Sequence, residues 1–398
     1  MWIAEREETD MDISSIAARF APEITALRRE IHRHPEIAFQ ERMTSAVVRR
    51  ELDRLGIPYR ACGGETGILA ELRGGQPGKT VLLRGDMDAL KVTEVTGADY
   101  ASEEAGFMHA CGHDGHTAML LGAAMVLNEV KASLCGRVLL AFQPAEEIAA
   151  GARAMIADGA LEGVDACFGM HLMTGVKGGT VLIPDGPVLS AADQFRIDIT
   201  GVGGHASQPH TAVDAVVTAA AVVTALQTVV SRETDPQETG VVTIGRMEAG
   251  TLFNAIAASA VLEGTVRTYR EEVRQRIEDA VQRIAVSTAE VYRAKAVCDY
   301  RRFCKATVND PAAAALMRRS AAAVFGSEQV RQDGRLMISE DFAEFAARVP
   351  SSFALVGIYD ESCDAVYPNH NGHFCFDESV LARGAALYAQ TALDFLGN

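Results

Sequence analysis

The chain has little positive charge and no long apolar run. Its 37 lysines and arginines are outnumbered by 53 aspartates and glutamates, which gives 398 residues a net charge of −16. Nucleic acids and anionic membranes repel such an excess of negative charge. No stretch approaches the roughly 18 apolar residues of a membrane span, and residues 1–12 are acidic where a secretory leader would be basic and then apolar. We therefore expect a cytoplasmic protein that binds neither nucleic acid nor a membrane.

Paired cysteine spacings, typical of a disulfide framework, are also missing. The eight cysteines are scattered along the chain, at Cys62, Cys111, Cys135, Cys167, Cys298, Cys304, Cys363 and Cys375. This distribution predicts free thiols in a reducing compartment. The rest of the composition, 48% hydrophobic and 23% charged, is ordinary for a globular protein, and the length allows two or three domains.

One thiol and three imidazoles occur together in residues 108–116, as His109, Cys111, His113 and His116. Cys111 and His113 are two apart, so in an extended segment both side chains would leave the same face. A thiolate and a neutral imidazole are good ligands for zinc-like ions. A lone cysteine here would be interpreted as a buried free thiol, but the cluster favours a metal site. A Cys–His nucleophile pair is the alternative.

Acidic and imidazole side chains also follow predicted buried strands. The strands at residues 79–84, 136–142 and 164–168 lead respectively into Asp86 and Asp88, Glu146 and Glu147, and His171. An α/β sheet places its site at such strand ends, although two aspartates there could equally be solubilising charges. Adjacent ionised glutamates repel each other. A dication would remove that cost for one of them and leave the other to act as a base, as in metal hydrolases.

The order of elements predicts two domains. Strands alternate with helices in residues 1–186 and again in 304–398, which indicates an α/β catalytic metal-binding domain with a parallel-rich mixed sheet. Residues 187–303 instead follow the β-α-β-β-α-β order of a ferredoxin-like α+β sandwich. We predict that this segment is an inserted domain. Its helix at residues 213–230 is apolar almost all round, which suggests burial against a further surface.

These motifs together resemble the M20 metallopeptidase and amidohydrolase family. The resemblance is closest to the branch with hippurate hydrolase, N-acyl-amino-acid amidohydrolases and the plant auxin-conjugate hydrolases. It covers nearly the whole chain, from His32-Arg33-His34-Pro35-Glu36 to the terminal helix. The segments that carry it are residues 84–90, 108–116, 143–147, 169–172, 203–206, 340–342 and 370–374.

The resemblance implies roles for individual residues. The family's metal ligands fall on Cys111, His113, Glu147, His171 and His370, and its catalytic base falls on Glu146. His205 matches the small-domain histidine that reaches the partner subunit's active site. Asn254 and Arg267 match positions that bind the substrate's carboxylate or backbone. The family pattern leaves His109, His116 and His373 outside the metal shell.

Three departures from the family pattern remove neither a ligand nor the base. Lys91, Ala257 and Gly372 stand where the family usually has proline. The second and third border the substrate pocket, so they bear on specificity and not on the type of reaction.

The resemblance implies an enzyme: a metal-dependent amidohydrolase that cleaves N-acyl amino acids, with two divalent ions per subunit. Zinc is favoured, with manganese, cobalt and nickel as alternatives. The small-molecule substrate would be converted to a carboxylate and a free amino acid. A dipeptidase or carboxypeptidase with the same machinery is one alternative, and a non-catalytic metal- or ligand-binding protein on this fold is another. The family further implies a homodimer, or a higher oligomer, formed through residues 187–303, which would act as a dimerisation and lid domain.

Overall fold

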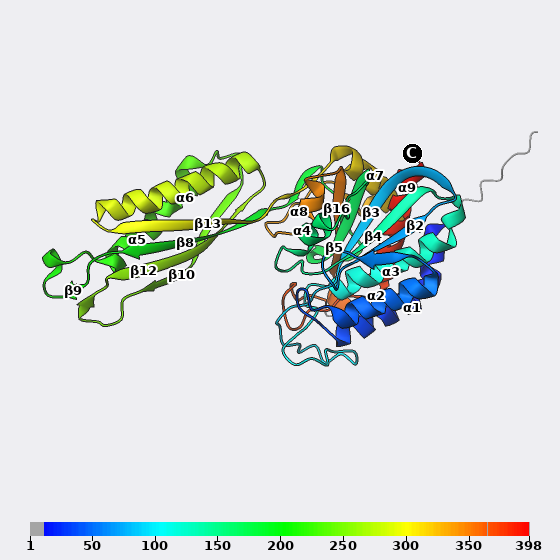
Figure 1. The fold of residues 1–398 in the computed structure, drawn as a ribbon, viewed down its shortest axis with the longest axis horizontal. Helices are drawn as coiled ribbons and strands as arrows, with labels where there is room; N and C mark the ends of the chain where they lie inside the picture. The colour runs from blue at the N-terminus through cyan, green and yellow to red at the C-terminus, as the bar shows by residue number, and fades with distance from the viewer. Residues whose placement is uncertain (1–11, 364, 398) are drawn as a thin grey trace, which may run out of the picture. The chain divides into compact units, whose positions relative to one another are not determined.

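The computed structural model describes residues 12–363 and 365–397 (Figure 1). Residues 1–11 lie outside these described ranges. They contain most of the acidic stretch on which the expectation of no leader rests. The chain folds into two compact units, each with most of its contacts inside itself. The larger unit contains residues up to Gly186 together with Val308–Gly334 and the residues from Glu344 on, and the smaller unit contains Pro187–Thr307 and Arg335–Ala343. Residues 304–307 and 335–343, which the prediction assigns to the catalytic domain, therefore group with the smaller unit.

The larger unit is built on a mixed sheet of eight strands in the order β1-β2-β4-β3-β5-β16-β6-β15. The strands are β1 (Tyr59–Ala61), β2 (Ile68–Arg73), β3 (Gln76–Asp86), β4 (Cys135–Gln143), β5 (Ala166–Lys177), β6 (Val181–Leu182), β15 (Val330–Arg331) and β16 (Ser351–Tyr359). The central strands β4, β3, β5 and β16 run parallel, and antiparallel pairs flank them. The predicted parallel-rich mixed sheet is confirmed.

Helices cover this sheet and supply most of the larger core. They are α1 (Ile13–Arg33), α2 (Arg42–Leu55), α3 (His113–Glu129), α4 (Gly151–Ala157), α7 (Pro311–Phe325), α8 (Ala343–Ala346) and α9 (Ser379–Gly397). Helices α3 and α9 lie against β3, and α1 packs on both (Figure 1). Because α3 is buried nearly all round, from His113 to Leu127, its first turn is held rigidly at the end of the central strands.

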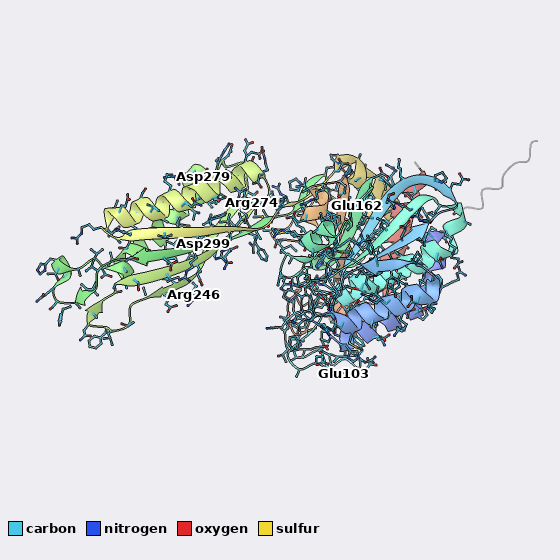
Figure 2. All side chains as sticks on the ribbon, viewed as in Figure 1. Glu103, Glu162, Arg246, Arg274, Asp279 and Asp299 are labelled. Atoms are coloured by element: carbon cyan, nitrogen blue, oxygen red, sulfur yellow. The ribbon has the colours of Figure 1, made fainter. Side chains whose placement is uncertain are left out.

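The smaller unit has the predicted ferredoxin-like topology. Its order along the chain is β8 (Ala191–Thr200), α5 (Ala215–Thr228), β10 (Gly240–Ala249), β12 (Ser259–Thr268), α6 (Glu271–Val291) and β13 (Lys295–Cys304), and its antiparallel sheet has the order β10-β12-β8-β13. Both helices pack on one face of the sheet around a core that includes Phe195 and Leu262. The other face carries charges: Arg246, labelled in Figure 2, and Arg196 both bind Glu263 at 2.9 Å.

Helix α5 differs from its prediction at its C-terminal end. The α-helix ends at Thr228 and continues as a π-helix, Val229–Glu233. Within the described residues, the stretch Ala215–Glu233 is the one helix long and apolar enough to cross a membrane by length and composition alone, although the sequence was expected to contain no such run. Only 33% of the most apolar 18-residue stretch of this helix is buried, and Val216 and Val217 remain exposed. The unit's own sheet therefore covers only one side of this apolar helix.

Candidate metal centre

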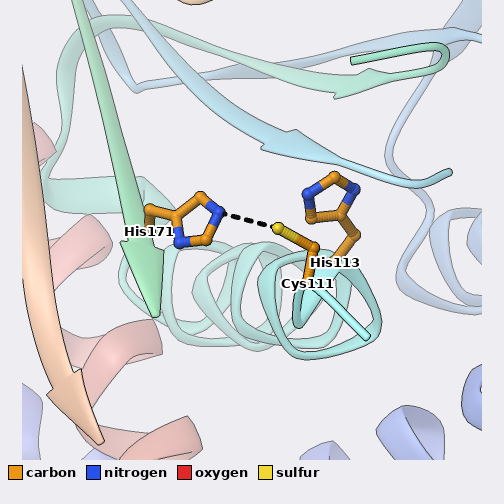
Figure 3. A group of neighbouring side chains, drawn as sticks. All are labelled: Cys111, His113 and His171. Carbon is orange, nitrogen blue, oxygen red and sulfur yellow. Dashed lines mark hydrogen bonds between the residues drawn. The ribbon is translucent and has the colours of Figure 1, made fainter. Parts of the chain in front are cut away.

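The ligand cluster begins at a sharp turn between the loop that holds Cys111 and helix α3. Gly112 adopts a left-handed conformation, with φ of 89°, and His113 is the first residue of α3. The expectation that Cys111 and His113 share one face of an extended segment is therefore wrong. The glycine turn, which lacks a Cβ to oppose positive φ, directs both side chains to one place instead (Figure 3).

His171 reaches the same place from strand β5. The prediction ended this strand at residue 168, but β5 continues to Lys177 because it keeps pairing with β16. Its pairing with β3 stops at Gly169, opposite Arg84, so the histidine lies just beyond the paired part of β5, level with Asp86 at the end of β3. Its Nε2 lies 3.4 Å from the Sγ of Cys111 (Figure 3).

The remaining predicted ligands close the cluster. The ligand atoms of Cys111, His113 and His171 all lie within 4.8 Å of one another, and the same holds for Cys111, Glu147 and His370. His370 Nε2 is 3.4 Å from Glu147 Oε1, and His113 Nε2 is 3.9 Å from both Glu146 Oε2 and Glu147 Oε1. Two groups of three donors thus share the thiol.

Hydrogen bonds on the outer nitrogens leave two imidazoles ready to bind a cation. His113 Nδ1 donates to the carbonyl of Asp88 at 2.8 Å, and His171 Nδ1 donates to the carbonyl of Leu172 at 2.7 Å. The Nε2 lone pairs then face the cluster. His113 Nε2 is buried and has no hydrogen-bond partner among the described residues, a costly arrangement that a metal ion would satisfy. The mixed set of sulfur, nitrogen and oxygen donors also fits a divalent transition metal.

The electrostatics of the cluster agree with a cation site. Burial and the nearby Glu147 raise the pKa of the Cys111 thiol, so the thiolate forms there only with a positive partner. Hydrogen bonds with Cys111 and Glu147 raise the pKa of His370 to about 10. A free nucleophilic cysteine requires the opposite shift, which disfavours the alternative of a Cys–His nucleophile pair.

Two aspartates that were absent from the predicted ligand and base assignments support the cluster from behind. Asp88 accepts the backbone N–H groups of Glu146 and Glu147 on its two oxygens, each at 3.0 Å. Asp86 accepts from His116 Nδ1 at 2.6 Å. His116 Nε2 in turn accepts from the backbone N–H of Leu172 at 2.9 Å, so both of its nitrogens are occupied. The position of both aspartates directly after a buried strand was the signal that could have placed them here.

Three residues of the site's loops have positive φ without being glycine, namely Ala145, Ala149 and His370, at 56°, 50° and 69°. Two of them flank the glutamate pair. Such conformations cost about 1–3 kcal/mol each and cluster at functional sites, where the surrounding structure maintains them. Around the glutamates that support includes Asp88, and Glu41, whose Oε1 accepts the backbone N–H of Ala145 at 2.9 Å.

Comparison with known proteins agrees with this geometry. The sequence profile described as peptidase family M20/M25/M40 matches residues 82–394. The chain belongs to this family. An N-acetyl-L-cysteine deacetylase of Bacillus subtilis is 36% identical over 93% of this chain and 87% of its own length. IAA-amino acid hydrolase ILR1-like 2 of Arabidopsis thaliana is 37% identical over 99% and 91%.

A solved structure shows the same fold. The YXEP protein of Bacillus subtilis, described as a dinuclear metal binding peptidase of the M20 family, superposes with a TM-score of 0.84 at 34% identity, over 96% of this chain and 99% of that one. The M20 resemblance and the expectation of a metal-dependent amide hydrolase are confirmed by these relatives. The identity of the metal and the roles of individual residues stay predictions.

The predicted residues of the M20 chain fall into three places. The five expected ligands and Glu146 converge in the larger unit. In the smaller unit, His205 on β9 (Gly204–His205) pairs with Ala255 of β11 (Ala255–Ile256), and the carbonyl of Asn254 accepts the N–H of Ala206. Arg267 lies near the C-terminal end of β12. The first residue of β12 follows closely after β11, and at a rise of about 3.4 Å per residue Arg267 is about 27 Å from that start.

Proposed function

We propose that this M20 chain hydrolyses the amide bond of N-acyl amino acids and releases a carboxylate and a free amino acid. The observation that carries the proposal is the convergence of Cys111, His113, Glu147, His171 and His370 beside Glu146. The names of the two relatives, an N-acetyl-L-cysteine deacetylase and an IAA-amino acid hydrolase, describe small amides of this kind. We further propose that the enzyme acts in the cytoplasm, in keeping with its free cysteines.

Two divalent ions would be held by the two groups of donors that share Cys111, one completed by His113 and His171 and the other by Glu147 and His370. Zinc is our first expectation because the set combines sulfur and nitrogen donors; manganese, cobalt and nickel are the alternatives. Bound divalent ions supply Lewis acidity: they polarise a carbonyl oxygen and lower the pKa of a coordinated water towards about 7.

Glu146 is assigned the proton transfers. Its backbone is held by Asp88, and its carboxylate lies at the edge of the cluster, 3.9 Å from His113 Nε2. Glu146 takes a proton from the attacking water as the new bond from oxygen to the acyl carbon forms. It then gives that proton to the amide nitrogen as the C–N bond breaks, so the amine leaves neutral. Glu147, turned towards His370, keeps its charge for the metal.

We assign His205 to the active site of a second copy, where it would stabilise the oxyanion of the tetrahedral intermediate. Asn254 belongs to the same end of the smaller unit, whereas Arg267 lies near the other end of β12. A single smaller unit therefore cannot bring His205, Asn254 and Arg267 to one active site. In a homodimer, the second copy would supply the residue that the first cannot. We propose that Arg267 and Asn254 bind the carboxylate or backbone of the substrate.

The same proposal accounts for the apolar outer side of helix α5. Val216 and Val217 are exposed there, and burial of an apolar side chain is worth about 1.5–3 kcal/mol. The equivalent helix of a second copy would cover them. Strand β10, at the edge of the small sheet, offers unpaired backbone groups for the same contact.

A substrate screen tests the proposed function. Purified protein is stripped of metal and reconstituted separately with zinc, manganese, cobalt or nickel. It is then assayed against N-acyl amino acids and, in parallel, dipeptides and C-terminally extended peptides, with release of free amine as the readout. We expect the wild type to turn over the N-acyl amino acids, and we expect Glu146→Gln to abolish this turnover. Preferential cleavage of dipeptides would favour the peptidase alternative. Metal binding without any turnover would identify a binding protein, and turnover by the metal-free protein would refute the mechanism.

A further inference from the structure

His32 is a buried histidine near the end of helix α1, and the proposed reaction does not use it. Its side chain is 1% exposed. Nδ1 lies 2.8 Å from Asp114 Oδ2, and Nε2 lies 3.3 Å from the carboxylate of Glu94. Ionised carboxylates only accept hydrogen bonds, so both ring nitrogens donate and His32 joins the two acids as an imidazolium. Burial and Arg28 lower the pKa of His32, but Asp114 and Glu94 outweigh them and raise it above its ordinary value.

The first of these acids belongs to the metal cluster's helix. Asp114 directly follows His113 in the first turn of α3. Its Oδ2 also accepts from Nε of Arg28 at 2.6 Å, and that guanidinium is itself buried. The rings of Tyr100 and Phe376 lie 4.7 and 4.6 Å from it. Helix α1 therefore holds the start of α3, and with it the backbone of His113, through a buried ion pair and a charged hydrogen bond.

The second acid belongs to the segment that supports the other end of the cluster. The neighbour of Glu94, Val95, donates its backbone N–H to the carbonyl of Gly372 at 2.8 Å. The segment and the loop are so close that a Cβ on Gly372 would lie 2.4 Å from the carbonyl oxygen of Thr93. His370, two residues earlier in that loop, has the strained φ of 69°. Glu94 thus sits in the segment against which the His370 loop is built.

We propose that His32 is a positioning residue that sets the spacing between His113 and His370 by tying Asp114 to Glu94. It contacts neither ligand and lies outside the chemistry of the site. Its two hydrogen bonds connect the helix that carries His113 with the segment that supports the His370 loop. The inference rests on the proposed function only in taking His113 and His370 as metal ligands.

Loss of this connection is expected to weaken metal binding. Residues that orient ligands from outside typically cost about 10–100-fold in metal affinity when they are replaced. His32→Leu removes both hydrogen bonds and should show the full loss. His32→Gln has a single amide group and can reach only one acid, so it should fall between His32→Leu and the wild type. Glu94→Gln keeps an acceptor for His32 but weakens the charged contact, and should also be intermediate.

The experiment measures the dissociation constants of zinc for both ions by competition with a chromophoric chelator, at a temperature where every variant remains folded by circular dichroism. Asn309→Ala is the matched control. Asn309 is buried in the same unit and makes three hydrogen bonds to backbone groups of Pro184 and Phe353, and neither of these residues is an expected ligand or a contact of His32. It should lose stability and keep both zinc affinities.

Gly372→Ala provides a second route that leaves His32 intact. The added Cβ would force the His370 loop away from Thr93, so it should weaken the ion held by His370 by about 10–100-fold. The inference is overturned if His32→Gln and Glu94→Gln bind both ions within threefold of the wild type, even if their melting temperatures fall. If the wild type itself binds no divalent ion, the proposed function fails instead, so the two failures are distinguishable.

Discussion

Replacing Asp88 tests how the larger unit holds its two adjacent glutamates. Asp88 is 1% exposed, and each of its carboxylate oxygens accepts one backbone N–H, from Glu146 and from Glu147. His113 Nδ1 donates to the backbone carbonyl of Asp88 at 2.8 Å, and a side-chain substitution leaves this bond in place. The same nitrogen lies 3.4 Å from Asp88 Oδ1. Asp88→Ala and Asp88→Asn therefore act mainly on the glutamate loop and keep the stronger of the two contacts with the histidine.

The expected magnitude follows from the two lost hydrogen bonds. A hydrogen bond to a charged group contributes about 1.5–3 kcal/mol, so Asp88→Ala should cost about 3–6 kcal/mol of unfolding free energy. That is a large part of the roughly 5–15 kcal/mol available to a domain. Asp88→Asn keeps one acceptor oxygen and turns an N–H donor towards the other backbone N–H, so it should cost at least about 1.5–3 kcal/mol. Displacement of Glu147 should weaken metal binding about 10–100-fold.

Urea unfolding of the metal-free variants measures the stability term, and chelator competition measures metal binding. Asp165→Asn is a suitable control because this carboxylate also accepts one backbone N–H, that of Thr80 at 2.7 Å, away from the cluster. We expect it to lose stability only. If Asp88→Asn is destabilised yet binds metal and turns over substrate as the wild type does, Asp88 does not position the glutamates and the reasoning fails.

Four further outcomes are expected. Glu146→Gln should retain metal while losing about 10²–10⁴-fold in kcat, whereas Glu147→Gln should lose metal, and equal metal loss in both would reject the division of roles. Cys111 should resist alkylation in the metal-loaded protein and react after chelation; equal labelling rates would exclude it as a ligand. Chelation should abolish turnover, and metal analysis should find up to two divalent ions per chain. His205→Ala should lose about 10²–10³-fold. Subunit exchange with Glu146→Gln should restore the activity of the mixture up to about a quarter of the wild type, since about half the dimers are mixed and each has one intact site. Verified mixed dimers without recovery would place His205 outside a partner's site.

Much of this protein could be predicted from local patterns. Strands such as β3 and β4 are apolar because both faces of a central parallel sheet are buried, so their positions were visible without a structure. The ferredoxin-like order of residues 187–303 followed from periodicity alone. The motif around Cys111, together with the glutamate pair after β4, indicated both the type of donor and its place at the strand ends.

Other features were decided only by contacts between distant segments. His171 lies inside β5 because β16, about 180 residues later, extends that strand. The cluster geometry at His113 depends on a glycine turn whose φ no hydrophobic pattern encodes. The extent of the smaller unit along the chain likewise depends on where residues 335–343 pack.

The amino-acid sequence by itself determined which kind of sheet this M20 protein has, because that depends on residue type and short-range periodicity. It also predicted the donors and the base, through the motifs that carry the family resemblance. Only the tertiary structure showed what holds the donors in place. Asp88 and His32 act through hydrogen bonds to residues 25 to 82 positions away in the chain, and packing determines which residues become such partners. The sequence does not indicate which segments a carboxylate such as that of Asp88, or an imidazole such as that of His32, will connect. That depends on where the buried helices and strands bring these side chains.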